Sequence, residues 1–197
     1  PFGHVSQLPA ILAGAGLDSF IFTRGAGPWI KAAGGIFNWY ASDGKTKVLS
    51  VKQVPDYPNL MAWGFENRPL DRKDSLDVDV DSAMDKMQRL LDKHEEIDWK
   101  PNVLLFGQGS DHTHPQPTLP MLIGKANNKF NGVCRFEHSS FSAYIEALRG
   151  WLGRKKVYRY EGELHSGWDR NVLSGVFSSR LYQKRANDHT MRLLRDQ

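Results

Sequence analysis

Strand-like and helix-like segments alternate along this chain, and this alternation is what most constrains its fold. Short β-rich runs are predicted at 17–25, 35–51, 102–107, 132–138 and 156–164. Segments with helical periodicity are predicted at 5–16, 74–96, 118–130, 139–152 and 174–197. Such alternation predicts an α/β fold in which mostly parallel strands are covered by helices on the outside.

Three segments allow more specific predictions. The run "GIFNWYASDGKTKVLSV" (35–51) is typical of a β-hairpin, because Asp43-Gly44 separates two β-rich stretches. Thr118 is a candidate N-cap for the helix at 118–130. The helix at 139–152 is expected to bury one apolar face, made by Phe141, Tyr144, Ile145 and Leu148.

Composition excludes several classes of protein. The chain has 197 residues, is 40% hydrophobic and carries a single cysteine, Cys134, so it can bury a core but cannot form an internal disulfide. No apolar run approaches the length of a membrane span, so we expect no membrane partner. The net charge is only +4, and the basic run at 153–160 is best interpreted as a solvated loop entering a strand, so we expect no nucleic-acid partner.

Reactive groups in α/β folds lie on loops that follow strands. One such loop, "GQGSDHTHPQP", places Asp111, His112 and His114 directly after a predicted strand. Asp111, partly shielded by apolar neighbours, is a candidate general acid, and the H-x-H spacing of His112 and His114 could bind a divalent metal. The alternative is a polar loop in which Asp111 caps the turn.

Arg24 ends the predicted strand "SFIFTR". Its planar guanidinium could orient a carboxylate or a sugar hydroxyl at this position. A surface ion pair is an equally good interpretation of the position alone.

Several motifs together resemble the α-mannosidases of glycoside hydrolase family 38, in particular the bacterial branch. "PFGHVSQLPAIL" followed by "GLDSFIFTRG" resembles the segment after the family's nucleophile. "LLFGQGSDHTHPQPTLP" resembles its acid/base loop, and "YEGELHSG" and "LSGVFSSRLYQKRANDHTMRLL" resemble the strand and helix that follow. The resemblance implies a partial β/α barrel that acts on an α-mannoside oligosaccharide or glycoconjugate by a retaining mechanism.

The resemblance also implies roles for individual residues. Asp111 would be the acid/base, and Arg24 would contact the nucleophilic Asp, which is expected directly before Pro1. Phe2 would pack on the sugar beside the metal, and Tyr57 and His112 would contact the substrate.

His4 and His114 would support the residues that touch the substrate. The metal implied by the family is divalent, usually zinc. Its expected ligands are an H-x-D pair upstream, the Asp before Pro1 and a His beyond Gln197, so this chain would hold none of them.

We therefore expect residues 1–197 to be one part of the catalytic domain, without the upstream part of the barrel and the downstream helical and β-sandwich domains. A cytoplasmic location and a homo-oligomer in the intact protein complete these expectations. Two alternatives remain at this point. One is a metal-dependent, deacetylase-like hydrolase that uses Asp111, His112 and His114, and the other is a non-catalytic, carbohydrate-binding remnant.

Overall fold

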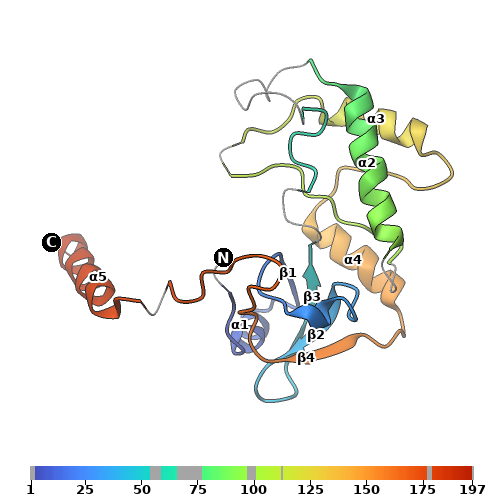
Figure 1. Ribbon diagram of the computed structural model, residues 1–197. Helices are drawn as coiled ribbons and strands as arrows, with labels where there is room; N and C mark the ends of the chain where they lie inside the picture. Colours follow the sequence, from blue (N-terminus) through green and yellow to red (C-terminus); the bar gives the residue numbers. More distant parts are fainter. Residues whose placement is uncertain are drawn as a thin grey trace.

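The computed structural model describes residues 3–53, 59–65, 77–96, 101–111, 113–176 and 179–196. Its helices are α1 (Leu8–Gly14), the 3-10 helix η1 (Pro28–Ile30), α2 (Val80–Glu95), α3 (Leu119–Lys129), α4 (Phe141–Leu152) and α5 (Leu181–Arg195). Its strands are β1 (Ser19–Phe22), β2 (Ile36–Tyr40), β3 (Lys47–Lys52) and β4 (Tyr158–Glu161). Figure 1 shows the sheet with α1 and α4 in one part of the molecule, α2 and α3 in a second part, and α5 standing apart from both.

The four strands form one sheet in the order β1-β3-β2-β4. β1 pairs with β3 and β2 pairs with β4 in parallel, whereas β2 and β3 form the antiparallel hairpin. The predicted α/β class, the mostly parallel sheet and the hairpin are therefore confirmed. Within the described residues the sheet is open and does not close into a barrel, since β1 and β4 lie at its two edges.

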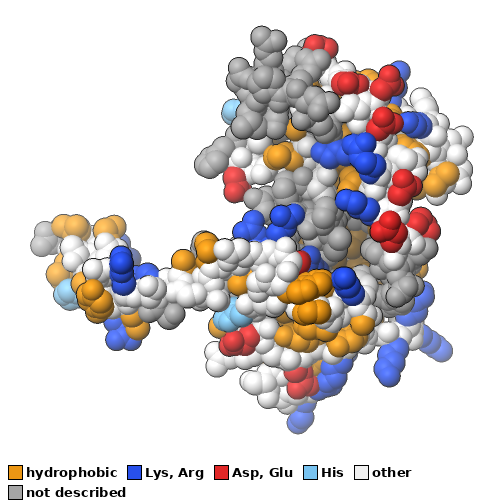
Figure 2. Space-filling model, in the orientation of Figure 1, with side chains coloured by type: hydrophobic (Ala, Val, Ile, Leu, Met, Phe, Trp, Pro, Cys, Tyr) orange, Lys and Arg blue, Asp and Glu red, His pale blue; other side chains and the backbone are white. Residues whose placement is uncertain are grey.

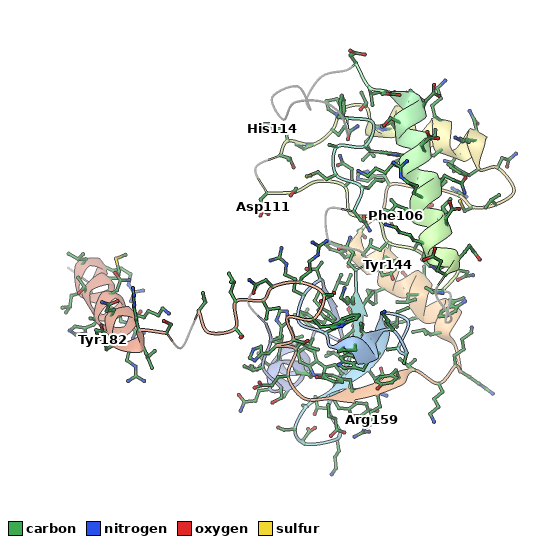
Figure 3. All side chains as sticks on the ribbon, viewed as in Figure 1. Phe106, Asp111, His114, Tyr144, Arg159 and Tyr182 are labelled. Atoms are coloured by element: carbon green, nitrogen blue, oxygen red, sulfur yellow. The ribbon has the colours of Figure 1, made fainter. Side chains whose placement is uncertain are left out.

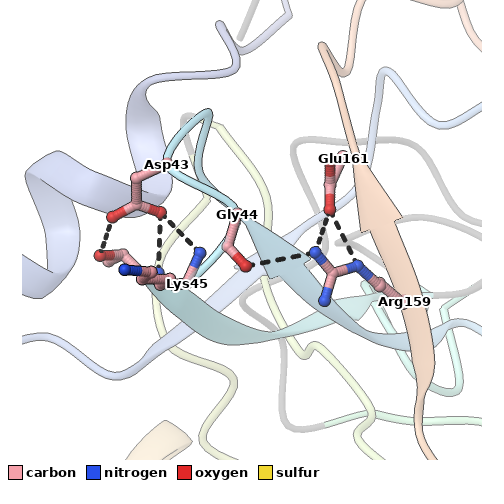
Figure 4. Close-up of polar contacts among 6 residues, drawn as sticks. Asp43, Gly44, Lys45, Arg159 and Glu161 are labelled. Atoms are coloured by element: carbon pink, nitrogen blue, oxygen red, sulfur yellow. Dashed lines mark hydrogen bonds and ion pairs between the residues drawn. The ribbon is translucent and has the colours of Figure 1, made fainter.

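The hairpin turn is made by local hydrogen bonds and fastened to β4 (Figure 4). Asp43 Oδ1 accepts from the main-chain N–H groups of Lys45 and Thr46, at 2.9 and 2.8 Å. The Arg159 guanidinium of β4 donates to the Gly44 carbonyl at 3.3 Å and pairs with Glu161. This turn therefore sets the register of the hairpin and ties it to the neighbouring parallel strand.

α4 covers one face of the sheet with the apolar side that the sequence predicts, except at its first residue. Tyr144, Ile145 and Leu148 are buried in a cluster with side chains of β2 and β3. Phe141 was expected to be buried with them but is 63% exposed. The physical reason is its place on the first turn of α4, where it lines an open groove beside the edge strand β1.

A second apolar cluster holds the other part of the molecule together. α2 and α3 pack on each other around Met87 and Leu122, and the segment 59–65 adds Trp63 to the same cluster. The indole Nε1 of Trp63 donates to the carbonyl of Ala83 at 2.6 Å, which fastens this segment to α2. The segment 59–65 is therefore a fixed part of this region.

Two predicted strands, at 102–107 and 132–138, are wrong, because the described residues of these segments form no regular strand. Side chains from other segments form hydrogen bonds with the main-chain groups of these two segments instead. Asn127 of α3 donates to the carbonyl of Phe136 at 2.9 Å and accepts from its N–H at 2.8 Å. Phe106, Cys134 and Phe136 pack against the α2–α3 cluster rather than within the sheet. An apolar run alone did not distinguish these extended segments from paired strands.

Two expectations about helix ends are also corrected. Thr118 directly precedes α3, but its side chain makes no capping hydrogen bond; its hydroxyl accepts from Gln116 instead. The terminal helix, predicted from residue 174, begins only at Leu181 as α5, and none of its described residues is buried. Figure 2 shows hydrophobic and basic side chains side by side on this helix.

Of the helices in the described part of the chain, none has the length and apolar character that a membrane crossing requires.

Candidate active site

Two segments, one around His4 near the start of the chain and one around Gly25 after β1, are joined by a third segment, 162–166, which follows β4. The main chains of His4 and Leu164 exchange hydrogen bonds of 3.1 and 2.9 Å. The N–H of Ser166 donates to the carbonyl of Gly25 at 3.0 Å. Three motifs separated by up to 160 residues in sequence therefore meet beside the sheet.

Glycine is required at two points of this junction. Gly3 and Gly25 have φ values of +99° and +107°, which side chains rarely adopt. A Cβ atom at Gly3 would lie 2.1 Å from the ring of His165, and one at Gly25 would lie 2.1 Å from the carbonyl oxygen of Leu164. The glycines of the "FGH" and "TRG" motifs therefore allow the close approach of the third segment.

His4 lies among aromatic rings. Its imidazole makes edge contacts with Phe20, Phe22 and Trp39, with ring centroids 5.0, 6.1 and 6.4 Å away. Burial is the main reason why the pKa of His4 is lowered from 6.5 to about 4. A neutral imidazole at neutral pH fits the supporting role expected for this residue, though nothing in the geometry assigns it a substrate.

Arg24 lies two residues after the end of β1 and is half-buried. Its Nε atom is buried and has no hydrogen-bond partner among the described residues. A buried guanidinium N–H without an acceptor is costly, so this donor is available for a group that the described residues do not provide.

A buried ion pair lies at the end of β3. Lys52 Nζ is 2.7 Å from Asp169 Oδ2, and the two side chains are 5% and 20% exposed. The other oxygen of Asp169, Oδ1, is buried without a partner in the described part of the chain. This pair joins the sheet to the segment that follows β4.

Asp111 and His114 lie in the other part of the molecule. Figure 3 shows both on the side of the region that contains α2 and α3, with Arg159 of β4 on the opposite side of the molecule. Both residues are exposed. The apolar shielding predicted for Asp111 is therefore not supplied by its described surroundings. The structure thus brings His4 and the Arg24 loop to one junction and places Asp111 and His114 elsewhere.

Phe2, Tyr57 and His112 were also predicted as site residues, and all three lie outside the described residues. Their roles stay predictions.

The sequence prediction missed two buried residues beside the Asp111 loop, Asn59 and Gln116, which are each 7% exposed. Both side chains bond to the main chain around this loop. The only sequence signal for Gln116 is an amide between two prolines in "HPQPT", and nothing in the sequence around Asn59 indicates a partner more than 40 residues away.

A protein metal site needs several donor side chains close together. Among the described residues, no three His, Cys, Asp or Glu side chains lie close enough together to hold a metal ion. The metal interpretation of the H-x-H pair gains no support from the described His114.

Comparison with known proteins relates these features to a family. The model of the glycosyl hydrolases family 38 N-terminal domain matches residues 1–163. A protein of Halalkalibacterium halodurans with the name "Putative mannosylglycerate hydrolase" is 29% identical over 199 residues. That alignment covers 98% of this chain but 21% of the relative, so the chain spans about a fifth of the relative's length.

Proposed function

Because the chain belongs to glycosyl hydrolase family 38, we propose that it forms part of the catalytic domain of a retaining α-mannosidase. The observation that carries the proposal is the junction of the "FGH", "TRG" and "ELHS" motifs, with the unpartnered Nε of Arg24 beside it. In this proposal, the carboxylate expected directly before Pro1 provides the acceptor that Arg24 Nε lacks among the described residues.

In this proposal the Asp before Pro1 attacks the anomeric carbon, and Asp111 donates a proton to the glycosidic oxygen as that bond breaks. Asp111 then removes a proton from water, which attacks the anomeric carbon and releases the nucleophile. Asp111 lies on an exposed loop, so the apolar surroundings of a general acid would come from the bound sugar and from parts of the protein outside this chain.

The described residues do not bring three donor side chains together. In this proposal, the ligands of a zinc ion would therefore lie outside the described residues. When bound, such a metal would orient sugar hydroxyls and withdraw charge from the ring. Family membership accounts for the same loop, so the deacetylase-like alternative loses its basis.

The name of the relative suggests a narrower substrate, mannosylglycerate. We propose it as the first substrate to test against an aryl α-mannoside and an α-linked mannobiose. A kcat/KM at least about 10-fold higher for mannosylglycerate would support it, since that ratio compares transition-state stabilisation between substrates. Equal values for all three would leave a general α-mannosidase.

The decisive experiment tests Asp111 in the full-length protein that carries this chain. Asp111→Ala should form the glycosyl-enzyme from a mannoside with an activated leaving group, yet hydrolyse it slowly, because no base activates water. Azide needs no base, so it should restore turnover by attacking the anomeric carbon, breaking the bond to the nucleophile and giving α-mannosyl azide. Full activity of Asp111→Ala on an alkyl α-mannoside would refute the assignment and favour the non-catalytic alternative for this loop.

The cytoplasmic location and the homo-oligomer stay predictions that the described residues do not test.

A further inference from the structure

The loop that carries Asp111 is fastened to one neighbouring segment, 59–65, by two buried amide side chains. Asn59 belongs to that segment and bonds to the start of the loop. Gln116 lies at the end of the loop and bonds back to that segment. Both residues are 7% exposed, so their polar groups depend on these partners rather than on water.

At the start of the loop, Asn59 fixes the main chain where it leaves the extended segment 103–107. Asn59 Oδ1 accepts from the N–H of Gly107 at 2.7 Å, and its Nδ2 donates to the carbonyl of Leu105 at 3.4 Å. The next residue, Leu60, donates its N–H to the Gly107 carbonyl at 2.9 Å. Side-chain and main-chain bonds together hold the first glycine of the loop.

At the end of the loop, the amide of Gln116 bonds in three directions. Its Nε2 donates to the carbonyl of Trp63 and to the hydroxyl of Thr118, both at 2.8 Å. Its Oε1 accepts from Nε2 of Gln108 at 2.9 Å. Because Gln108 lies at the start of the loop, this amide joins the two arms of the loop to each other and to the segment 59–65.

Between these two points, a tight turn presents Asp111. The Thr113 hydroxyl donates to the Ser110 carbonyl at 2.7 Å and accepts from the Ser110 N–H at 2.9 Å. The supporting segment is itself held by α2, through Trp63 Nε1 to Ala83 and through Lys86 Nζ to the Met61 carbonyl at 2.8 Å. Hydrogen bonds therefore lead from α2 through the segment 59–65 to both ends of the loop, and the turn that carries Asp111 lies between these two held ends.

We propose that Asn59 and Gln116 are positioning residues that hold Asp111 at the glycosidic oxygen; this rests on the proposed role of Asp111 as acid/base. Asp111 is exposed, and the loop before it contains Gly107 and Gly109, which have no side chains that could pack and so fix the loop. A proton donor must lie within hydrogen-bond distance of the oxygen that it protonates. The two buried amides supply the fixed geometry that the loop sequence does not.

Leaving-group dependence separates positioning from mere stability. The parameter kcat/KM reports the first step, in which Asp111 protonates the leaving oxygen. An alkyl leaving group needs that proton, whereas a dinitrophenolate departs without it. The ratio of the two kcat/KM values, alkyl over dinitrophenyl, does not change with the fraction of folded enzyme. A purely structural role would leave this ratio unchanged.

The test uses Gln116→Met and Asn59→Leu in the full-length protein, with methyl and 2,4-dinitrophenyl α-mannosides as substrates. Gln116→Met should lower kcat/KM for the methyl mannoside about 10- to 100-fold, as expected for a misplaced catalytic group. For the dinitrophenyl mannoside the loss should stay below about 3-fold. Asn59→Asp keeps the oxygen that accepts from Gly107. The alkyl-over-dinitrophenyl ratio of kcat/KM values should therefore fall less in Asn59→Asp than in Asn59→Leu.

The matched control is Gln88→Met. It removes an exposed amide of α2 that donates to Asp92 Oδ1 at 2.8 Å, and it should leave the ratio unchanged. Asp111→Asn completes the set. An unchanged ratio in Asp111→Asn would overturn the proposed function itself. A lowered ratio in Asp111→Asn, with an unchanged ratio in both Gln116→Met and Asn59→Leu, would overturn only the positioning proposal.

Discussion

The sheet region and the α2–α3 region hold their candidate site residues in different ways. Around the sheet, main-chain hydrogen bonds between His4 and Leu164 and between Gly25 and Ser166 fix the junction beside Arg24. In the α2–α3 region, two side-chain amides and one main-chain hydrogen bond, from Leu60 to Gly107, hold the ends of the Asp111 loop. Main-chain hydrogen bonds survive most side-chain substitutions, whereas a side-chain hydrogen bond is lost when that one residue is replaced. We therefore expect the first region to be sensitive at its glycines and the second at its amides.

Paired glycine substitutions give the largest expected effect. Gly25 and Gly109 both have positive φ, +107° and +121°, but only the Cβ at Gly25 would meet another atom, the Leu164 oxygen at 2.1 Å. Gly25→Ala should lower the free energy of unfolding by about 3 kcal/mol or more, and Gly109→Ala by about 1 to 2 kcal/mol from backbone strain alone. Urea unfolding measures both, and equal losses would contradict the comparison.

The ion pair at the end of β3 tests whether the sheet region also depends on a side chain. Lys52→Met keeps the buried stem but leaves the Asp169 carboxylate without its cation. We expect a loss of about 2 kcal/mol, less than for a fully buried pair because Asp169 is partly exposed. The double variant Lys52→Met with Asp169→Leu should recover part of this loss in the same urea measurement. If the double variant recovers no stability, the unpaired Asp169 carboxylate is not the cause of the loss in Lys52→Met.

A single indole nitrogen tests the α2–α3 region. Trp63→Phe removes the hydrogen bond from Nε1 to the Ala83 carbonyl. Because Trp63 is only 1% exposed, the smaller ring also leaves a small cavity in the α2–α3 cluster. We expect a loss of about 1 to 2 kcal/mol. Relative to the wild type, amide hydrogen exchange in the variant should accelerate more in the segment 59–65 and in the Asp111 loop than in the strands β1, β2 and β3. Equal acceleration in both regions would argue against two separately held regions.

The smallest effect concerns pH and the sheet region. An unfolded imidazole binds a proton near pH 6.5, whereas burial, helped by the nearby His165, lowers the pKa of His4 to about 4 in the folded protein. Between these values the unfolded state binds more protons, so stability falls as pH falls from about 6.5 towards 4. His4→Gln should reduce this dependence. Urea midpoints at pH 7 and pH 5 measure it, and an identical slope in the variant would exclude His4 as its source.

Residue patterns predicted some elements well and others poorly, for identifiable reasons. The hairpin at 35–51 was predictable because its turn and both of its strands are close in sequence. The segments 102–107 and 132–138 have equally apolar sequences, but Asn59 and Asn127 take the main-chain bonds that a neighbouring strand would have made. Phe141 matched the helical period of its neighbours, yet the first turn of α4 lies beside an open groove.

By itself, the sequence determined the α/β class, the hairpin, the family and the order of its motifs, because these depend on local patterns of residues. Only the tertiary structure decided that the loop after β4 meets His4 and Gly25, and that the amides of Asn59 and Gln116 join the two ends of the Asp111 loop to the segment 59–65. The physical reason is that each of these contacts joins residues about 50 to 160 positions apart, or satisfies a buried polar group whose partner no local pattern reveals.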